Sequence, residues 1–356
     1  MSTPSYPAAR AAAQRIHPLL TAHREQAARL DTPAPSPAVI ESILDAAFWA
    51  SLRREEGRVP KVSLAFVSQE AAGHNLCFGR PLPLDAASIT RLGPAVEKPS
   101  IHLGVWPLNG TLAIWGTTRQ IPPFCAVVEV IAPGLIVCKL SREDEGAKFA
   151  NLAVLEGDSI KLIDESSPAA ADCPSILTGL LADGPLRDTV VLPIAIAMRA
   201  HGRGGSLLVV PAGSDAWFES MTHPIPYPIL APGGETLALP GQHGVIEAIA
   251  GLTAVDGATV VNDRFEVLAF GAKISRRDGA SRVEQVTVTE PIEGSPAEIV
   301  HPTALGGTRH LSAAQFSQDQ KDAVALVASQ DGRFTAFGWS PCREMVHAYR
   351  LESLLL

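Results

Sequence analysis

The chain has 356 residues, 46% hydrophobic and 19% charged, which excludes the intrinsically disordered class and suggests about two domains. The formal net charge of −8 argues against a broad nucleic-acid or anionic-membrane surface, and no apolar run approaches the roughly 20 residues that span a bilayer. The N-terminal stretch lacks a signal-peptide core and the five cysteines form no C-x-x-C pair, so we expect a cytoplasmic protein with reduced thiols, no zinc site, and no nucleic-acid or membrane partner.

The first half of the chain predicts a small α+β domain. Helices are expected over residues 8–30, 37–54 and 84–92. Strand-like runs lie at residues 61–68, 102–106, 111–116, 126–131, 135–140 and 152–155. Pro18 should kink or split the first helix, and Asn109-Gly110 is typical of a hairpin turn in a compact antiparallel sheet. Trp106 and Trp115, one on each arm of this hairpin, could form a ligand-binding face but are more typical of a core.

The second half predicts an α/β layer structure. A polar, Ala-rich stretch at residues 164–171 marks a boundary near residue 170, which divides the chain into residues 1–170 and 171–356. Helices are expected over residues 175–181, 190–201, 241–252 and 306–316. Strands are expected over residues 206–210, 259–261, 267–272, 322–329 and 333–338. This succession is typical of a mixed sheet flanked by helices.

The turn Asp256-Gly257-Ala258 is the first of three candidate ligand-binding segments. It follows a predicted helix and leads into a predicted strand. Gly257 lets the backbone come close to a ligand, and Asp256 adds a carboxylate. The alternative is an ordinary Asx turn between helix and strand, as a second Asp-Gly-Ala copy at residues 278–280 illustrates.

The second candidate segment opens a predicted helix with two glycines, the second being Gly307, followed by Thr308, Arg309 and His310. The glycines expose backbone N–H groups, and the helix dipole adds positive potential. Thr308 and Ser312 can donate hydroxyl hydrogens to phosphate, Arg309 can bind it in bidentate fashion, and His310 can bind phosphate or metal. The alternative is a helix capped by Thr308, but a cationic first turn is unfavourable in a plain helix and therefore favours an anion site.

The third segment is the acidic turn Ser329-Gln330-Asp331, followed by Gly332. In this order the three segments resemble the diadenylate cyclase (DAC) domain, which joins two ATP molecules into cyclic di-AMP and pyrophosphate. That family carries D-G-A, then G-T-R-H-R, then S-E-E-x-G, and the resemblance covers roughly residues 175–345. It implies ATP as substrate, Mg²⁺ or Mn²⁺ as cofactor, and a face-to-face dimer because each protomer holds one ATP.

The resemblance also implies roles for individual residues. The implied catalytic residues are Asp256, Arg309 and His310. The implied nucleotide-binding residues are Gly257, Ala258, Gly307, Thr308, Arg309, Ser312 and Ser329. The implied metal ligands are Asp256, His310 and Asp331.

The chain departs from the family pattern at several positions. Leu311 stands where the family has its second Arg, which removes one phosphate contact. Gln330 and Asp331 replace two Glu residues, and a neutral amide is a weak Mg²⁺ ligand. Val255 precedes Asp256 where many family members have His. These departures favour a second interpretation, a catalytically weak or inactive DAC-like protein that binds a nucleotide and signals. A third interpretation is a purely structural scaffold without a ligand.

Three segments of the first half are similar to the probable sensor region (DACNV-like) that precedes DAC domains in some bacterial proteins. They are residues 50–57, 79–84 and 112–116. The similarity implies a regulatory domain with an unknown small-molecule ligand. The leading expectation is therefore a diadenylate cyclase-like nucleotidyltransferase under the control of an N-terminal sensor domain.

Overall fold

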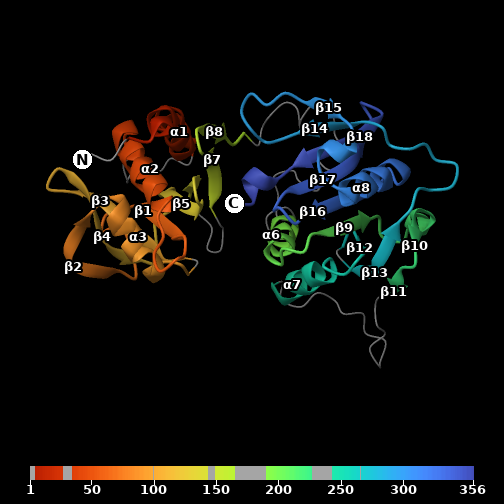
Figure 1. Cartoon of the computed structure of the whole chain (residues 1–356), viewed down its shortest axis with the longest axis horizontal. Coiled ribbons are helices and arrows are strands. Elements are labelled where there is room, and N and C mark those ends of the chain that lie inside the picture. The colour runs from red at the N-terminus through yellow and green to blue at the C-terminus, as the bar shows by residue number, and fades with distance from the viewer. Residues whose placement is uncertain are drawn as a thin grey trace. The chain divides into compact units, whose positions relative to one another are not determined.

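The computed structural model describes residues 5–26, 34–98, 100–142, 149–164, 190–226, 243–264 and 266–356. The chain forms two compact units, Met1–Asp164 (with Leu356) and Glu165–Leu355. Each unit contains a mixed β-sheet with α-helices, which confirms the α/β class (Figure 1). The expected boundary near residue 170 and the expected helix over residues 175–181 lie outside the described residues.

The first unit is an eight-stranded sheet with helices packed on one face (Figure 1). Its helices are α1 (Pro7–Gln26), α2 (Pro37–Ser51) and α3 (Ala86–Leu92). Its strands are β1 (Val62–Phe66), β2 (Leu76–Pro83), β3 (His102–Leu108), β4 (Thr111–Thr118), β5 (Ala126–Ala132), β6 (Leu135–Leu140), β7 (Ala150–Glu156) and β8 (Ser159–Leu162). They are ordered β2-β4-β3-β1-β5-β6-β7-β8.

The expectation of a purely antiparallel sheet is wrong at one pair of strands. β1 and β3 run parallel, whereas the other neighbouring strands pair antiparallel. Parallel neighbours need a long crossover connection, and β2 and α3 lie in the chain between β1 and β3. The sequence pattern missed β2, whose glycine and two prolines break the alternation of a strand, and it missed the short β8.

Of the two expected effects of Pro18, a kink or a split, the split does not occur, because α1 continues through it as one element. A proline inside a helix costs about 3 kcal/mol. The same helix buries Ile16 and Leu20, which are 1% and 2% exposed, together with several alanines in the core. Burial of each large side chain contributes about 1.5–3 kcal/mol, so packing outweighs the lost hydrogen bond.

The predicted hairpin between β3 and β4 is confirmed. Asn109 and Gly110 both have left-handed φ, 52° and 81°, as a tight hairpin turn requires. The core interpretation of Trp115 is confirmed too, because the side chain is fully buried and its Nε1 donates to the Val67 carbonyl at 2.8 Å. Trp106 is half-buried against Phe66, with ring centroids 4.7 Å apart.

The second unit is built around a ten-stranded mixed sheet. Its described helices are α6 (Leu192–Ala200), α7 (His243–Leu252) and α8 (Thr308–Asp319). Its strands are β9 (Gly205–Val210), β10 (Met221–Thr222), β11 (Ile225–Pro226), β12 (Ala258–Asn262), β13 (Val267–Ile274), β14 (Val286–Thr289), β15 (Glu298–Val300), β16 (Val324–Ala328), β17 (Phe334–Ser340) and β18 (Met345–Arg350). The order is β10-β13-β12-β9-β16-β17-β18-β14-β15, and β11 also pairs with β13.

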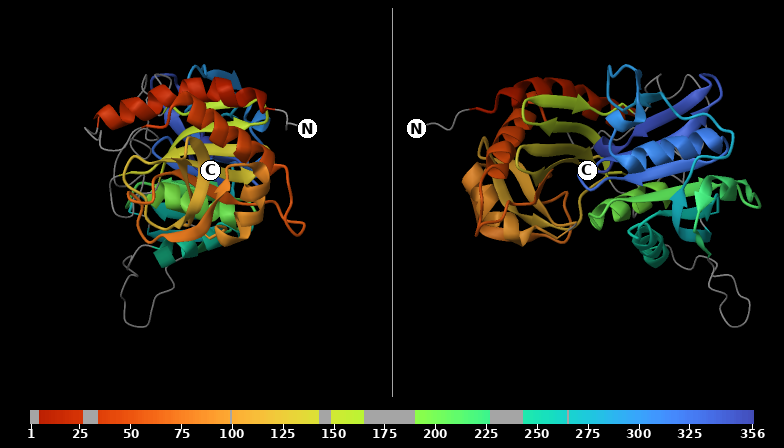
Figure 2. Two further views of the ribbon diagram at one scale, coloured as in Figure 1. Left: turned by 90° about the vertical axis from the view of Figure 1, so that its left-hand side faces the viewer. Right: turned by 45° about the vertical axis from the view of Figure 1, so that its right-hand side comes forward.

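Helices cover both faces of this sheet (Figure 1 and Figure 2). Along β9, Leu207 belongs to the core beneath α6 and α7, whereas Leu208 belongs to the core beneath α8. Strands that are covered on both faces lose the alternation of polar and apolar residues, and β9, β12 and β16 are indeed fully buried. No helix in the described parts of either unit is long and apolar enough to cross a membrane.

The strand pairing of the second unit gathers several loops at one edge of the sheet. β9 and β12 are parallel with Ser206 opposite Ala258, so both strands begin at this edge. β16 runs antiparallel to β9 with Ala328 opposite Gly205, so β16 ends there. The segments that precede β9 and β12 and the segment that follows β16 are therefore neighbours. We call this place the motif edge, and it comprises residues 203–205, 255–257 and 329–332.

The cysteines differ from expectation at one position. Cys342 is disulfide-bonded, so the prediction of reduced thiols is wrong there, whereas Cys77, Cys125 and Cys138 are free. Five cysteines at irregular spacing carry no pairing signal, because a disulfide requires two Cα atoms to approach within about 7 Å in the fold.

Replacing Gly104 should destabilise the first unit. A Cβ atom at Gly104 would overlap the indole ring of the buried Trp115. Overpacking of a core is costly, so we expect Gly104→Ala to lower the free energy of unfolding by about 3 kcal/mol in urea titrations. The control is Gly79→Ala in β2, where a Cβ meets nothing within 4 Å. Equal stability of the two variants would contradict this account of the Trp115 pocket.

Candidate functional site

The start of α8 lies against the turn that enters β9. The helix is capped by Gly307 without a side-chain acceptor, and its first turn holds no acidic residue. Thr308 is therefore the first helical residue and not the cap, which differs from the plain capped helix considered as the alternative. Such a helix start carries positive potential and unpaired backbone N–H groups.

The side chain of Arg309, in the first turn of α8, packs against the turn before β9, and its N–H groups have no hydrogen-bond acceptor among the described residues. A Cβ atom at Gly204 would sit 3.2 Å from Arg309 Nη1 and 3.4 Å from Gln330 Cγ, and Gly204 has a left-handed φ of +69°. Glycine at this position thus lets the guanidinium group approach the backbone. Arg309 is half-buried and has no hydrogen-bond or ion-pair partner among the described residues. It is placed to bind an anion at the motif edge.

Asp256 and Gly257 lie in the turn that enters β12. The exposed carboxylate of Asp256 accepts a hydrogen bond from Lys273 Nζ on β13 at 2.8 Å. Lys273 lowers the pKa of Asp256, and the charge of Arg309 lowers it further. The turn before β12 and the start of α8 therefore interact electrostatically. Gly257 has a φ of +116°, and a Cβ there would lie 2.5 Å from the backbone of Gly271. Ala258 is buried in β12, so only its backbone can reach a ligand.

The turn after β16 is closed by its own side chains. The Ser329 hydroxyl donates to the carboxylate of Asp331, which also pairs with Arg333 at 3.3 Å. The hydrogen bond from Ser329 is the main cause that lowers the pKa of Asp331. Gln330 Nε2 donates to the Arg203 carbonyl at 3.3 Å and joins this turn to the one before β9.

His310 lies inside the core, and its implied catalytic and metal-binding roles stay predictions. The side chain is 1% exposed and meets Phe337 edge-on at 6.0 Å between ring centroids. Burial lowers the pKa of His310, and its Nε2 atom has no hydrogen-bond partner among the described residues. Ala313 and Ala314 share the buried face of α8, so helical periodicity could have placed His310 there.

The predicted metal ligands do not form a cluster. Among the residues that the structure describes, no group of three or more His, Cys, Asp or Glu side chains could hold a metal ion. Asp256 is paired with Lys273, Asp331 is paired within its turn, and His310 is buried. A metal site built from these three side chains stays a prediction.

The structure thus brings together most of the residues predicted to bind a nucleotide. Those at or beside the motif edge are Gly257, Ala258, Gly307, Thr308, Arg309 and Ser329. Ser312 lies one turn into α8 and lines a pocket on the flank of this helix. The sequence pattern missed Lys273, because its contact with Asp256 spans 17 residues and leaves no periodic signal.

The first unit holds a row of buried polar side chains across its sheet. Ser63 on β1 lies opposite Glu129 on β5. Ser63 Oγ is 2.7 Å from His102 Nδ1, and Lys139 Nζ donates to Glu129 Oε2 at 2.6 Å. Burial lowers the pKa of His102. The members of this row partner one another, as buried polar groups require, so the row does not by itself indicate a ligand.

A hollow between the helices and the sheet of the first unit is too small for a ligand. It has a volume of about 20 Å³ and is lined mainly by apolar side chains, among them Ile16, Ile40 and Leu64. Ligand pockets usually measure about 300–1,000 Å³. The expected small-molecule ligand of this unit stays a prediction.

The whole chain has little similarity to curated proteins and solved structures. No curated protein matches the sequence. A solved structure that matches is the hypothetical membrane spanning protein from Bacillus cereus, with 15% sequence identity, 49% of this chain and 68% of that chain covered, and a TM-score of 0.29. A likeness of this size supports no inference about this chain.

A family model also matches within the first unit. It is described as "Probable sensor domain DACNV" and matches residues 29–119, a range that includes α2, α3 and β1 to β4. The resemblance proposed for the first half is thereby confirmed, whereas no DAC catalytic domain is identified. Residues 29–119 of this chain are thus similar to the DACNV probable sensor domain.

Proposed function

We propose that the second unit is a nucleotide-binding domain of the diadenylate cyclase type, with ATP as its ligand, and that the DACNV domain regulates it. One observation carries the proposal. The turns before β9 and β12, the turn after β16 and the start of α8 converge at the motif edge, where Arg309 has no hydrogen-bond or ion-pair partner among the described residues. Backbone N–H groups and a free guanidinium group are the usual means of binding phosphate.

The proposed reaction is the attack of the 3′-hydroxyl of one ATP on the α-phosphorus of another. A new P–O bond forms between the 3′-oxygen and the α-phosphorus, the bond from the α-phosphorus to the oxygen of the β-phosphate breaks, pyrophosphate leaves, and the hydroxyl proton passes to water. The second ring bond forms in the same way. Catalysis of this kind depends on positioning and on neutralising negative charge. Arg309 and the start of α8 would bind the phosphates, and Asp256 would orient the attacking hydroxyl. Two protomers facing each other would supply the two ATP molecules.

A divalent metal would enter with the nucleotide. Mg²⁺ is often held by one or two protein carboxylates together with substrate phosphates, and Asp256 is the exposed carboxylate beside Arg309. When bound, Mg²⁺ or Mn²⁺ would neutralise part of the phosphate charge. Asp256 would have to exchange its contact with Lys273 for this role.

A second candidate function is nucleotide binding without turnover. It is favoured by the state of the acidic side chains, because Asp256 is held by Lys273 and Asp331 is held by Ser329 and Arg333. Leu311 packs partly against the core where the DAC family has a second Arg. In this case the second unit would bind ATP as a signal and pass its state to a partner.

Removing the guanidinium group of Arg309 should weaken ATP binding. A hydrogen bond to a charged group is worth about 1.5–3 kcal/mol, so Arg309→Ala should raise the dissociation constant for ATP by about tenfold or more in calorimetry. The control is Arg343→Ala, an exposed residue in the turn between β17 and β18 at the opposite edge of the sheet. Unchanged affinity in Arg309→Ala would rule out this anion site.

Turnover separates the two candidate functions. The protein should convert ATP to cyclic di-AMP in the presence of Mg²⁺ or Mn²⁺, as detected by mass spectrometry. Asp256→Asn should lower the rate by about 100-fold or more, the scale on which positioned acid–base groups act, while ATP still binds. If the wild-type protein binds ATP without forming product under either metal, nucleotide binding without turnover is the function.

A further inference from the structure

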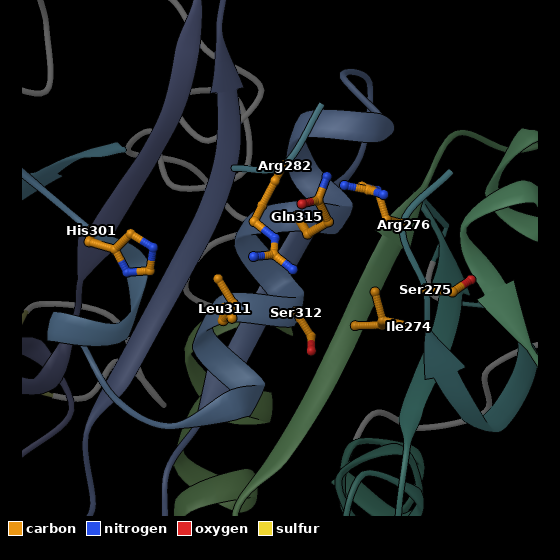
Figure 3. Close-up of a pocket in the computed structure, with 8 residues that line it drawn as sticks. All are labelled: Ile274, Ser275, Arg276, Arg282, His301, Leu311, Ser312 and Gln315. Carbon is orange, nitrogen blue, oxygen red and sulfur yellow. The ribbon is translucent and has the colours of Figure 1, made fainter. Parts of the chain in front are cut away.

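A cationic pocket lies on the flank of α8, next to the motif edge (Figure 3). It has a volume of about 300 Å³, which is in the range of small-molecule sites. Its lining residues are Ile274, Ser275, Arg276, Arg282, His301, Leu311, Ser312 and Gln315. Figure 3 shows the guanidinium group of Arg282 extending toward Leu311 and Ser312, and Arg276 pointing toward Gln315 from the other side.

The two arginines of this pocket have no ion-pair partner in the described parts of the chain, and the nearby carboxylate of Asp319 instead accepts from the Arg277 backbone N–H and from Gln315 Nε2. Neither Arg276 nor Arg282 forms an ion pair or a side-chain hydrogen bond there, and no lining residue carries a carboxylate. Their neighbour Arg277 behaves differently, because its Nε pairs with Glu219 Oε2 at 2.6 Å. The chain has a net charge of −8, so two unpaired cations in one hollow are a local exception that favours an anionic ligand.

The position of the pocket connects it to the motif edge. Ile274 directly follows Lys273, the partner of Asp256, and Leu311 and Ser312 follow Arg309 on α8. The same helix start adds positive potential on this side. Ile274 and Leu311 line the pocket with apolar surface, and Ser312 adds a hydroxyl group. An anion bound here would lie beside a ligand held by Arg309.

We propose that this pocket binds phosphoryl groups through Arg276 and Arg282. This proposal rests on the proposed function: the phosphoryl groups are those of the bound nucleotide. The two arginines would therefore select between nucleotides by the number of phosphates they carry. Two guanidinium groups can contact the oxygens of adjacent phosphoryl groups in one chain, so a polyphosphate gains more contacts and more charge neutralisation than a single phosphate, and an uncharged nucleoside gains neither. The pocket therefore discriminates in favour of a polyphosphate.

The first test measures the binding of inorganic tripolyphosphate to the full chain by calorimetry. The double variant Arg276→Gln/Arg282→Gln should weaken binding by about tenfold or more, whereas the matched control Arg277→Gln should leave it unchanged. Both arginines are exposed and unpaired in the described structure, so the thermal unfolding midpoint should not move. Wild-type protein without tripolyphosphate binding, or equal losses in the control, would overturn the proposal.

A second variant approaches the pocket from α8. Ser312→Asp places a carboxylate in the first turns of the helix, where negative charge is stabilising, and it should pair with the arginines and abolish tripolyphosphate binding. Retained binding in this folded variant would contradict the proposal.

Measurements with ATP separate this proposal from the proposed function. If Arg309→Ala loses ATP while the double variant keeps both ATP and tripolyphosphate, the pocket is not a phosphate site and the nucleotide function stands. If tripolyphosphate binds through the two arginines but ATP does not bind, the pocket stands and the nucleotide function fails. Adenosine should bind more weakly than ATP in the wild-type protein, and equal affinity would overturn the polyphosphate preference.

Discussion

The parallel pairing of β9 with β12 is the constraint on which the second unit depends. It places the starts of two buried strands at one edge, and the antiparallel β16 brings its end to the same place. Three turns that are far apart in sequence thereby become neighbours, and the hydrogen bond from Gln330 Nε2 to the Arg203 carbonyl joins two of them. Two glycines complete the arrangement, because Gly204 admits Arg309 and Gly257 admits the backbone of Gly271. The fold thus creates a polar edge on a sheet that is otherwise covered by helices.

The charges at this edge are unequally satisfied. Asp256 and Asp331 form ion pairs with cationic side chains, whereas Arg309, Arg276 and Arg282 form no ion pair with a carboxylate among the described residues. A surface of this kind attracts an anion more readily than a cation. This imbalance supports phosphate binding more directly than it supports a metal-dependent reaction. It is therefore consistent with both proposed functions, ATP cyclisation and ATP binding without turnover.

Much of the fold can be predicted from sequence, because local patterns specify it. The helices α2, α7 and α8, the buried strand β9 and the Asn109-Gly110 hairpin all follow from periodicity, capping and turn chemistry. The parallel pair β1–β3 and the strands β10, β11, β14, β15 and β18 carry no such signal, because they are short or depend on pairing between distant segments. Tertiary packing likewise decides that α1 continues through Pro18.

The candidate site is less predictable than the fold. Asp256 and Arg309 are identified from motifs, but Lys273, Arg276 and Arg282 come from segments without a motif and are recognised only by where they lie. His310 belongs to a motif and also to the buried face of its helix, and the motif alone does not reveal that burial. Chemistry that depends on distant contacts is visible only in three dimensions.

Hydrogen–deuterium exchange of the full chain with and without ATP tests the central claim most directly. The account predicts that saturating ATP slows backbone exchange in the peptides that contain residues 203–206, 255–258, 307–313 and 329–333, because these segments meet at the motif edge. Peptides from the opposite edge, around residues 341–344, should be unaffected. Protection confined to the first unit, or no protection in the four segments, would contradict the account.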